Sequence, residues 1–198
     1  MPATPLAIFD FDGTLTTRDT FGDFCLFVFG PVKCMLKAPL ALAALLWAGL
    51  RRGTRGHMKE AVFAVFFRGM ALEKFNTLCG RYCRERLSAV LSPRALDKVR
   101  WHVNAGHRLI IISASPSNWI EPWALANGFS AVLATGVQVE GGNLTGRFST
   151  PNCYGPEKVV RFNAAYARGE YHIYSYGDSP ADKYILALAD EPFFRRFE

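Results

Sequence analysis

The sequence predicts an α/β fold with a parallel sheet, because three short strand-like runs each end in a group of polar residues. The runs are Leu6–Phe9, Leu109–Ile112 and Tyr171–Tyr176, and each has the length of a buried strand. Segments with helical periodicity separate them, as in an α/β sheet with helices on both faces. In such a sheet, polar residues gather at the carboxyl ends of the strands, where ligands bind.

Length and composition fit one globular domain, or a core with a modest insertion. The chain has 198 residues and a mass of 22.0 kDa. Half of the residues are hydrophobic and 20% are charged, which excludes a disordered chain. The net charge is +6, and residues 16–91 hold 12 Lys and Arg against 5 Asp and Glu. Such a basic region favours an anionic substrate, a membrane surface or nucleic acid as a partner.

The first strand ends in two carboxylates, in the run Asp10-Phe11-Asp12-Gly13-Thr14. If the strand continues through Asp12, its period of two places both carboxylates on one face. Like charges at that spacing raise each other's pKa, so the pair needs a cation or a shared proton. A β-turn capped by Asp explains Asp12-Gly13 but leaves Asp10 unexplained.

A helical and unusually apolar pattern follows this motif. Apolar residues recur every three or four positions up to Gly30-Pro31, which marks a predicted helix end. Further helices are predicted over Met58–Phe67 and Leu72–Val90. We therefore predict a helical cap over 16–91 and a core made of 1–15 and 92–198.

The segment Ala38–Leu50 contains thirteen residues without a charge. It is shorter than the roughly twenty residues that a bilayer crossing requires. We favour a buried helix of the cap. The alternative is a membrane-contacting helix, because basic residues flank the segment and suit an anionic interface. These flanking residues are Lys33, Lys37, Arg51, Arg52 and Arg55.

The second half of the chain alternates predicted helices and strands. The predicted elements are a helix from Pro93 to His102, a helix over Trp119–Ala126, a strand over Ala131–Ala134, a hairpin over Val137–Gly146 and a helix from Pro156. The last part of the chain is short, and Arg195-Arg196 stand where an apolar strand is expected. We therefore predict an incomplete final sheet edge.

Four motifs resemble those of the haloacid-dehalogenase-like (HAD) phosphatases and occur in the family's order. Asp10–Thr16 matches the first motif, DxDGTLT, and Ser113 matches the second. Lys158 matches the third motif, and Gly177–Asp182 matches the fourth, GDSxxD. The helical insertion after the first motif is similar to the C1 cap of subfamily IB, the phosphoserine-phosphatase-like branch. The resemblance implies a Rossmann-like three-layer parallel-sheet HAD core with an inserted all-helical C1 cap.

The resemblance also implies a Mg²⁺-dependent phosphatase that forms an aspartyl-phosphate intermediate. Asp10 would be the nucleophile, and Asp12 would be the general acid and base. Ser113, Ala114 and Lys158 would bind the phosphoryl group of the substrate.

For the metal, the resemblance implies oxygen ligands, which Mg²⁺ prefers. They are the carboxylates of Asp10 and Asp178 and the backbone carbonyl of Asp12. Asp182 would lie behind them and hold the metal end of the site or Lys158 in place. A metal explains how clustered carboxylates can remain ionised and still meet a dianionic substrate.

For the substrate, we favour a small soluble phosphomonoester such as a phosphoserine-like molecule. Asp19 lies nine residues after Asp10, where phosphoserine phosphatases carry a Glu that holds the substrate ammonium. The alternative is a lipid phosphate at the membrane surface. The apolar, basic cap also resembles that of bacterial phosphatidylglycerophosphate phosphatases.

Two further function classes are weighed against these. A non-enzymatic binder of membrane or nucleic acid would lack Asp10 or Asp178, and the sequence has both. We expect no nucleic-acid partner, because no RNA-binding motif or interleaved aromatic-basic platform is evident. A phosphotransferase or a phosphonatase on the same fold is the nearer alternative. Phosphonate chemistry would need a Schiff-base lysine in the cap, and nothing else in the sequence supports Lys59 as that lysine.

The five cysteines are an odd number without a CxxC pair, which favours free thiols in a reducing compartment. No signal peptide is predicted, because Met1 leads almost directly into the first strand. We therefore expect a cytoplasmic protein, with a peripheral position on the inner membrane face as the alternative.

Overall fold

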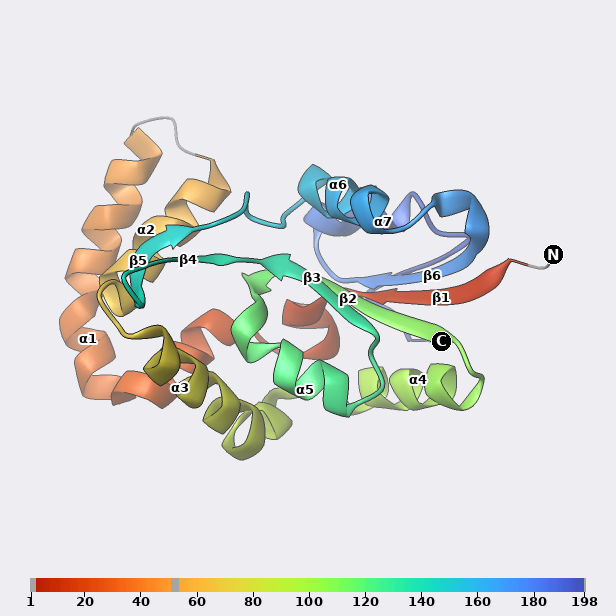
Figure 1. Cartoon of the computed structure of the whole chain (residues 1–198), viewed down its shortest axis with the longest axis horizontal. Coiled ribbons are helices and arrows are strands. Elements are labelled where there is room, and N and C mark those ends of the chain that lie inside the picture. The colour runs from red at the N-terminus through yellow and green to blue at the C-terminus, as the bar shows by residue number, and fades with distance from the viewer. Residues whose placement is uncertain (1–2, 51–53, 198) are drawn as a thin grey trace.

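A five-stranded parallel sheet forms the centre of the molecule (Figure 1), in a computed structural model that describes residues 3–50 and 54–197. The strand order is β3-β2-β1-β6-β7, and every neighbouring pair is parallel. The strands are β1 (Thr4–Phe9), β2 (Arg108–Pro116), β3 (Ala131–Thr135), β6 (Tyr171–Gly177) and β7 (Glu191–Phe194).

Helices cover the two faces of this sheet, which makes three layers (Figure 1). α4 (Pro93–Asn104) and α5 (Glu121–Ala126) lie on one face, and α6 (Pro156–Ala165) and α7 (Lys183–Leu186) lie on the other. Alternate residues of β1 serve two separate cores, with Phe9 in one and Ile8 in the other. Both faces are therefore buried, and the predicted α/β parallel-sheet fold is confirmed.

The sheet has a fifth strand, so the predicted incomplete edge is wrong. β7 runs parallel to β6 in a register that pairs Tyr174 with Glu191 and Gly177 with Phe194. The backbone N–H of Arg195 then donates to the carbonyl of Gly177 at 2.8 Å. An edge strand bonds a neighbour on one side only, and it therefore tolerates the short, polar and proline-containing run Glu191–Phe194.

A group of helices fills the sequence between β1 and α4, beyond the carboxyl ends of the strands (Figure 1). They are α1 (Thr20–Leu50), α2 (Arg55–Phe67), α3 (Leu72–Glu85) and a 3-10 turn over Leu87–Val90. The chain leaves and re-enters the core at one place, where the N–H of Ser92 donates to the carbonyl of Leu15 at 2.9 Å. The domain boundaries at 15 and 92 stay a prediction.

Aromatic rings hold these helices to the core. Phe24 of α1 stacks on Phe67 of α2 and on Trp119, with ring centroids 5.6 and 4.8 Å apart. All three rings are fully buried. The predicted hairpin is present as β4 (Val137–Glu140) and β5 (Asn143–Phe148), and β5 packs on α2.

α1 differs from the prediction in length and in burial. Gly30 interrupts it with φ 74° and ψ 165°, and the helix resumes at Pro31 and runs to Leu50, instead of restarting at Ala38. The favoured interpretation of 38–50 as a buried helix is wrong, because its large apolar side chains face outward. The physical reason is that α1 lies at the outer edge of the molecule and packs along α2 on one side (Figure 1).

Candidate active site

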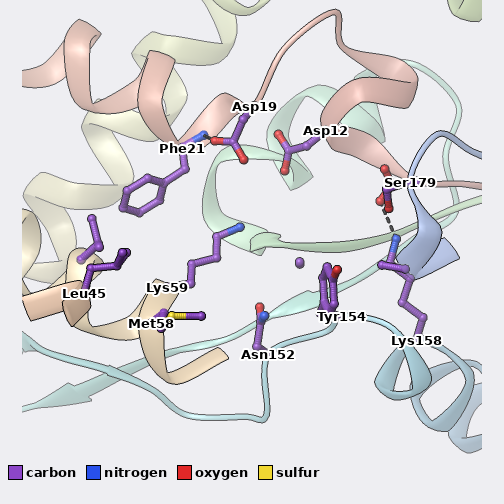
Figure 2. A pocket seen from close by; sticks show the side chains of 14 residues that line it. Asp12, Asp19, Phe21, Leu45, Met58, Lys59, Asn152, Tyr154, Lys158 and Ser179 are labelled. Carbon is purple, nitrogen blue, oxygen red and sulfur yellow. Dashed lines mark hydrogen bonds and ion pairs between the residues drawn. The ribbon is translucent and has the colours of Figure 1, made fainter. Parts of the chain in front are cut away.

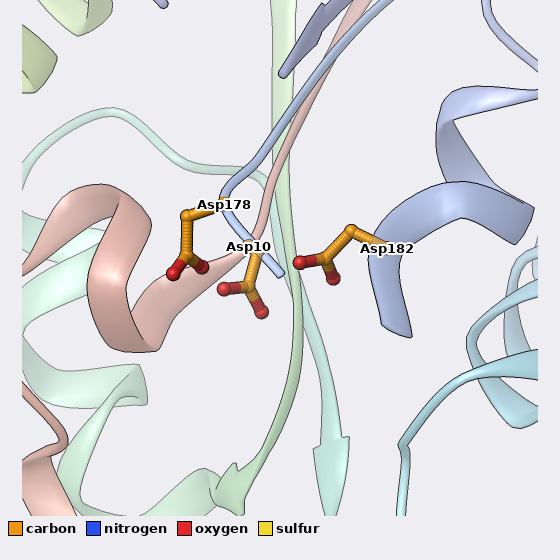
Figure 3. Close-up of side chains that lie close together, drawn as sticks. All are labelled: Asp10, Asp178 and Asp182. Carbon is orange, nitrogen blue, oxygen red and sulfur yellow. The ribbon is translucent and has the colours of Figure 1, made fainter. Parts of the chain in front are cut away.

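Three carboxylates converge at the carboxyl ends of neighbouring strands (Figure 3). Asp10 follows β1 and Asp178 follows β6, and the two strands end together because Phe9 pairs with Tyr176. Asp182 closes a short 3-10 turn, Pro180–Asp182, that comes after β6. One oxygen atom from each of these three carboxylates lies within 4.8 Å of the others. So close a cluster needs positive charge.

Lys158 supplies part of that charge from the first turn of α6. Its Nζ donates to Oδ1 of Asp10 and to Oδ1 of Asp182, at 2.5 Å each, and only 2% of the residue is exposed. Burial works to lower the pKa of Lys158, but the two carboxylates outweigh it and hold the amine protonated. Burial raises the pKa of Asp10 to about 7, although Lys158 opposes the shift. One lysine thus leaves the cluster short of cationic charge.

The donor set fits a magnesium ion. Oδ2 of Asp10 and Oδ1 of Asp178 lie 3.3 and 3.2 Å from the hydroxyl of Thr14, which can donate to either. A side chain at Gly13, where φ is +84°, would collide with the carboxylate of Asp178. Burial raises the pKa of Asp178 above its ordinary value, as expected for a carboxylate without a full counter-charge. Hard carboxylate oxygens in this arrangement are the ligands that Mg²⁺ takes.

The two oxygens of Asp182 are already engaged. Oδ1 accepts from Lys158, and Oδ2 accepts from the N–H and the hydroxyl of Ser179, at 3.0 and 2.8 Å. Asp182 is fully buried. It therefore fits a supporting position better than that of a metal ligand, and its role stays a prediction.

The side chain of Asp12 joins the first loop to the helical cap. β1 ends at Phe9, so the strand does not continue through Asp12. Oδ1 of Asp12 accepts from the N–H and the hydroxyl of Thr20, at 2.7 and 2.5 Å, and Thr20 begins α1. The indole of Trp119 donates to that same hydroxyl at 3.1 Å, which fixes its direction.

The other oxygen of Asp12 accepts from the hydroxyl of Ser115, a contact that the sequence analysis missed. Ser115 follows two residues after Ser113 at the end of β2, and the period of two in a strand was the signal that could have found it. Nζ of Lys59, from α2, donates to the Ser115 hydroxyl at 3.3 Å. Residues from α1, α2 and β2 therefore fix the orientation of the Asp12 side chain.

Two of the three residues predicted to bind phosphate line the cavity at Asp10 and Asp12, and the third, Ser113, does not. Ser113 is fully buried, and its hydroxyl accepts from the N–H of Ser115 at 3.1 Å. Ala114 and Lys158 line a cavity together with Asp10 and Asp12. The arrangement thus brings Ala114 and Lys158 to the acidic cluster, and the roles of all three residues stay predictions.

The cavity has a volume of about 380 Å³ and two unlike ends (Figure 2). The charged end holds Asp10, Asp12, Lys158 and Ser179. The other end lies between α1 and α2 and is apolar, with Phe21, Leu45, Met58 and Val62. A substrate whose phosphate lies at the charged end would thus extend toward the apolar side chains at the other end of the cavity.

Asp19 and Lys59 lie between the two ends of the cavity (Figure 2). Oδ1 of Asp19 accepts from the N–H groups of Phe21 and Gly22, at 2.9 and 3.3 Å, and so caps α1. Burial, followed by the charge of Asp12, raises the pKa of Asp19, and Lys59 opposes the shift. The role of Asp19 in substrate choice stays a prediction, and the amine of Lys59 donates to the hydroxyl of Ser115.

The sequence profile of the haloacid dehalogenase-like hydrolases matches residues 7–187. The chain belongs to this family. It is 29% identical to protein CicA of Caulobacter vibrioides, over 97% of this chain and 86% of that protein. It is also 25% identical to the probable phosphatase Rv3661 of Mycobacterium tuberculosis, over 93% of this chain and 66% of that protein.

Solved structures share the fold of this chain. A Bordetella pertussis protein of unknown function is 26% identical and superposes with a TM-score of 0.77, covering 93% of this chain and 86% of that one. A phosphoserine phosphatase in its apo form is 15% identical, with a TM-score of 0.59 and coverage of 94% and 83%. The family match makes this chain a haloacid dehalogenase-like hydrolase, and one of its relatives is a probable phosphatase.

Proposed function

We propose that the chain hydrolyses phosphomonoesters through an aspartyl-phosphate formed on Asp10, with Mg²⁺ as its cofactor. The single observation that carries this proposal is the cluster of Asp10, Asp178 and Lys158, of which Asp10 and Lys158 line one end of the cavity together with Asp12. It combines a nucleophile, a proton donor and cationic charge, which are the three requirements of phosphoryl transfer.

In the first half-reaction, a carboxylate oxygen of Asp10 attacks phosphorus and the ester P–O bond breaks. Asp12 gives its proton to the leaving oxygen, so an alcohol departs and Asp12 becomes a carboxylate. Lys158, Ser113 and the backbone at Ala114 hold the phosphoryl oxygens. When bound at Asp10, Asp178 and the carbonyl of Asp12, Mg²⁺ would neutralise charge on the carboxylates and the phosphate.

In the second half-reaction, Asp12 takes a proton from water, and the resulting hydroxide attacks the phosphorus of the aspartyl-phosphate. The bond between phosphorus and the Asp10 oxygen breaks, which releases inorganic phosphate and restores the Asp10 carboxylate. Ser115 and Thr20 keep Asp12 directed for both proton transfers.

The two substrate classes differ in what they would place beyond the phosphate. A phosphoserine-like substrate would place its ammonium near Asp19, which lines the cavity. A phosphomonoester with an apolar group would place that group against Phe21 and Leu45. The second class gains support from the apolar side chains that α1 exposes to solvent.

A phosphatase screen tests the proposal. The purified chain is assayed on an aryl phosphate, phosphoserine and phosphatidic acid, with Mg²⁺ and after exhaustive chelation. We expect Mg²⁺-dependent release of phosphate, and its loss in Asp10→Asn at an unchanged melting temperature. Turnover that survives chelation, or that persists in Asp10→Asn, would contradict the proposal.

A further inference from the structure

The second half of α1 exposes large apolar side chains to solvent. Its most apolar window of 18 residues has a mean hydropathy of 1.6, and 6% of that window is buried. Among the described residues, α1 is the one helix long and apolar enough to cross a membrane by length and composition. Its exposed side chains include Met35, Leu36, Leu40, Leu42, Leu46, Trp47 and Leu50, between 57% and 80% exposed.

Within residues 31–50 of α1, most of the half-buried positions hold small residues, namely Cys34, Ala41, Ala44 and Ala48. Lys37 is the one long side chain on this side. Nζ of Lys37 donates to the carbonyl of Val65 in α2 at 2.8 Å, which fixes this side against α2. In water, the leucines of a helix pack inward, whereas in lipid, small residues line helix contacts and leucines face out. α1 follows the second pattern.

This apolar surface is continuous with the catalytic cavity. Leu45 is 38% exposed on α1 and lines the apolar end of the cavity beside Phe21 (Figure 2). The opposite end of the same cavity holds Asp10 and Lys158. An acyl chain leaving the cavity past Leu45 would therefore emerge on the exposed face of α1.

Geometry favours a helix that lies on a bilayer over one that spans it. The part from Pro31 to Leu50 is about 30 Å long at 1.5 Å per residue, which matches the hydrocarbon thickness. A spanning position would bring Leu45, and with it the charged cavity, to the bilayer interior. Charged groups there are costly, so the helix is better placed flat at the interface.

The charge around α1 favours anionic lipid, rather than a second copy of this chain, as the partner that covers its exposed face. No acidic residue occurs between Asp23 and Glu60, and Lys33 is exposed. The region 16–91 carries a net charge of +7, so two copies meeting at α1 would bring two basic regions together. Anionic head groups neutralise that charge instead.

We propose that α1 docks on a bilayer containing anionic phospholipid. We further propose that the substrate is a phosphomonoester lipid taken from that bilayer, a step that rests on the proposed phosphatase function. Leu42 and Leu46 would enter the acyl region, and the phosphate would reach Asp10 through the cavity.

Vesicle co-sedimentation without Mg²⁺ tests the docking apart from catalysis. Vesicles of phosphatidylcholine alone are compared with vesicles of equal parts phosphatidylcholine and phosphatidylglycerol, at low and high salt. We expect binding to the mixed vesicles that weakens with salt. Leu42→Asn with Leu46→Asn should reduce binding at least about tenfold, because burying even one of the two leucines is worth about that factor.

A matched double variant controls for the loss of exposed apolar surface. Leu125→Asn with Val160→Asn changes residues that are 61% and 58% exposed, against 58% and 57% for Leu42 and Leu46. These control positions lie on α5 and α6, and the control should bind vesicles as the wild type does. Equal losses of vesicle binding in the two double variants would show that α1 is not the docking surface.

Turnover measurements test the lipid substrate independently of the proposed phosphatase function. The variant Leu42→Asn with Leu46→Asn should lose about tenfold in phosphatidic acid turnover at limiting vesicle concentration, and keep aryl phosphate hydrolysis unchanged. If the wild type hydrolyses the aryl phosphate but never binds vesicles, the docking is wrong and the phosphatase function stands. If it binds vesicles and hydrolyses only water-soluble esters, the lipid substrate is wrong.

Two further outcomes are distinguishable. A wild-type dimer that this variant converts to a monomer, without vesicle binding, would make a second copy the occupant of α1 and overturn the bilayer proposal. Vesicle binding without hydrolysis of any phosphomonoester would support the docking and overturn the proposed function.

Discussion

Lys158 bridges Asp10 and Asp182, with its amine 2.5 Å from one oxygen of each carboxylate. The three side chains are nearly free of solvent contact. One buried cation thus connects the proposed nucleophile to the carboxylate behind it, and the two carboxylates depend on it for their charge balance.

Lys158→Met should therefore affect both stability and turnover. Without Mg²⁺, we expect a loss of about 3 kcal/mol in the free energy of unfolding, because two buried carboxylates lose their partner. Turnover should fall by about 100-fold or more, since a donor to the phosphoryl group is gone. Urea unfolding and steady-state kinetics measure these effects. Lys183→Met, at an exposed position nearby, is the control, and the account fails if the two variants behave alike.

Asp12→Asn should slow reactions that need protonation of the leaving group. We expect a loss of about 10²- to 10⁴-fold on alkyl phosphates and a smaller loss in the first half-reaction on aryl phosphates with acidic phenols. Single-turnover kinetics across a series of leaving groups measures this. An equal loss on all leaving groups would show that Asp12 is not the acid.

Ser115→Ala removes a hydroxyl that donates to Asp12. We expect kcat to fall about tenfold on alkyl phosphates with little change in KM, because the acid is less well directed. Ser115→Thr should restore most of the rate. Ser130→Ala is the control, since the hydroxyl of Ser130 bonds the carbonyl of Leu109, before the site end of β2. If kcat of Ser115→Ala falls equally on substrates with good and poor leaving groups, Ser115 does not position Asp12.

Asp23 should stabilise the cap at neutral pH and lose this effect in acid. It accepts from two nitrogens of Arg86, at 3.1 and 2.8 Å, and from the hydroxyl of Tyr82 at 3.0 Å. Burial works to raise the pKa of Asp23, but these hydrogen bonds outweigh it and hold the pKa below the ordinary 3.8. A lowered pKa in the folded state gives stability that is present above 3.8 and is lost as the pH falls through the folded value.

Asp23→Asn should accordingly lower the free energy of unfolding by about 2 kcal/mol at neutral pH. The loss is no larger because Arg86 is partly exposed and solvent screens its charge. The difference from the wild type should shrink in acid below the ordinary pKa of 3.8. Urea unfolding over a pH series measures it. Asp97→Asn, at an exposed residue of α4, should change stability by less than about 0.5 kcal/mol. A difference that grows in acid would contradict the account.

The sheet and the positions of the acidic residues could be predicted from the sequence, because strand ends carry local signals. Asp10 and Asp178 each follow a buried run directly, and parallel strands bring those ends together. The position of Lys158 relied on family resemblance, since a single lysine after Pro156 has no distinguishing local pattern. β7 was missed because four residues at a sheet edge are a weak signal.

The partners of Asp12 could not be predicted, because Thr20 and Ser115 come from segments that only the fold brings together. The exposure of α1 was missed for a different reason. An apolar run that faces lipid and one that fills a core have the same composition, and periodicity does not separate them. Only the packing of α1 on α2 shows which residues of 31–50 face outward.

The central claim is the phosphorylation of Asp10, and acid-quench mass spectrometry tests it most directly. Asp12→Asn is mixed with an aryl phosphate that has an acidic leaving group and is then quenched in acid, because this variant should form the intermediate and hydrolyse it slowly. We predict one added phosphoryl group per chain, mapped to the peptide containing Asp10, lost on treatment with hydroxylamine and absent when Asp10→Asn is added. A phosphoryl group on another residue, or turnover of the substrate without any covalent phosphate on Asp10, would contradict the account.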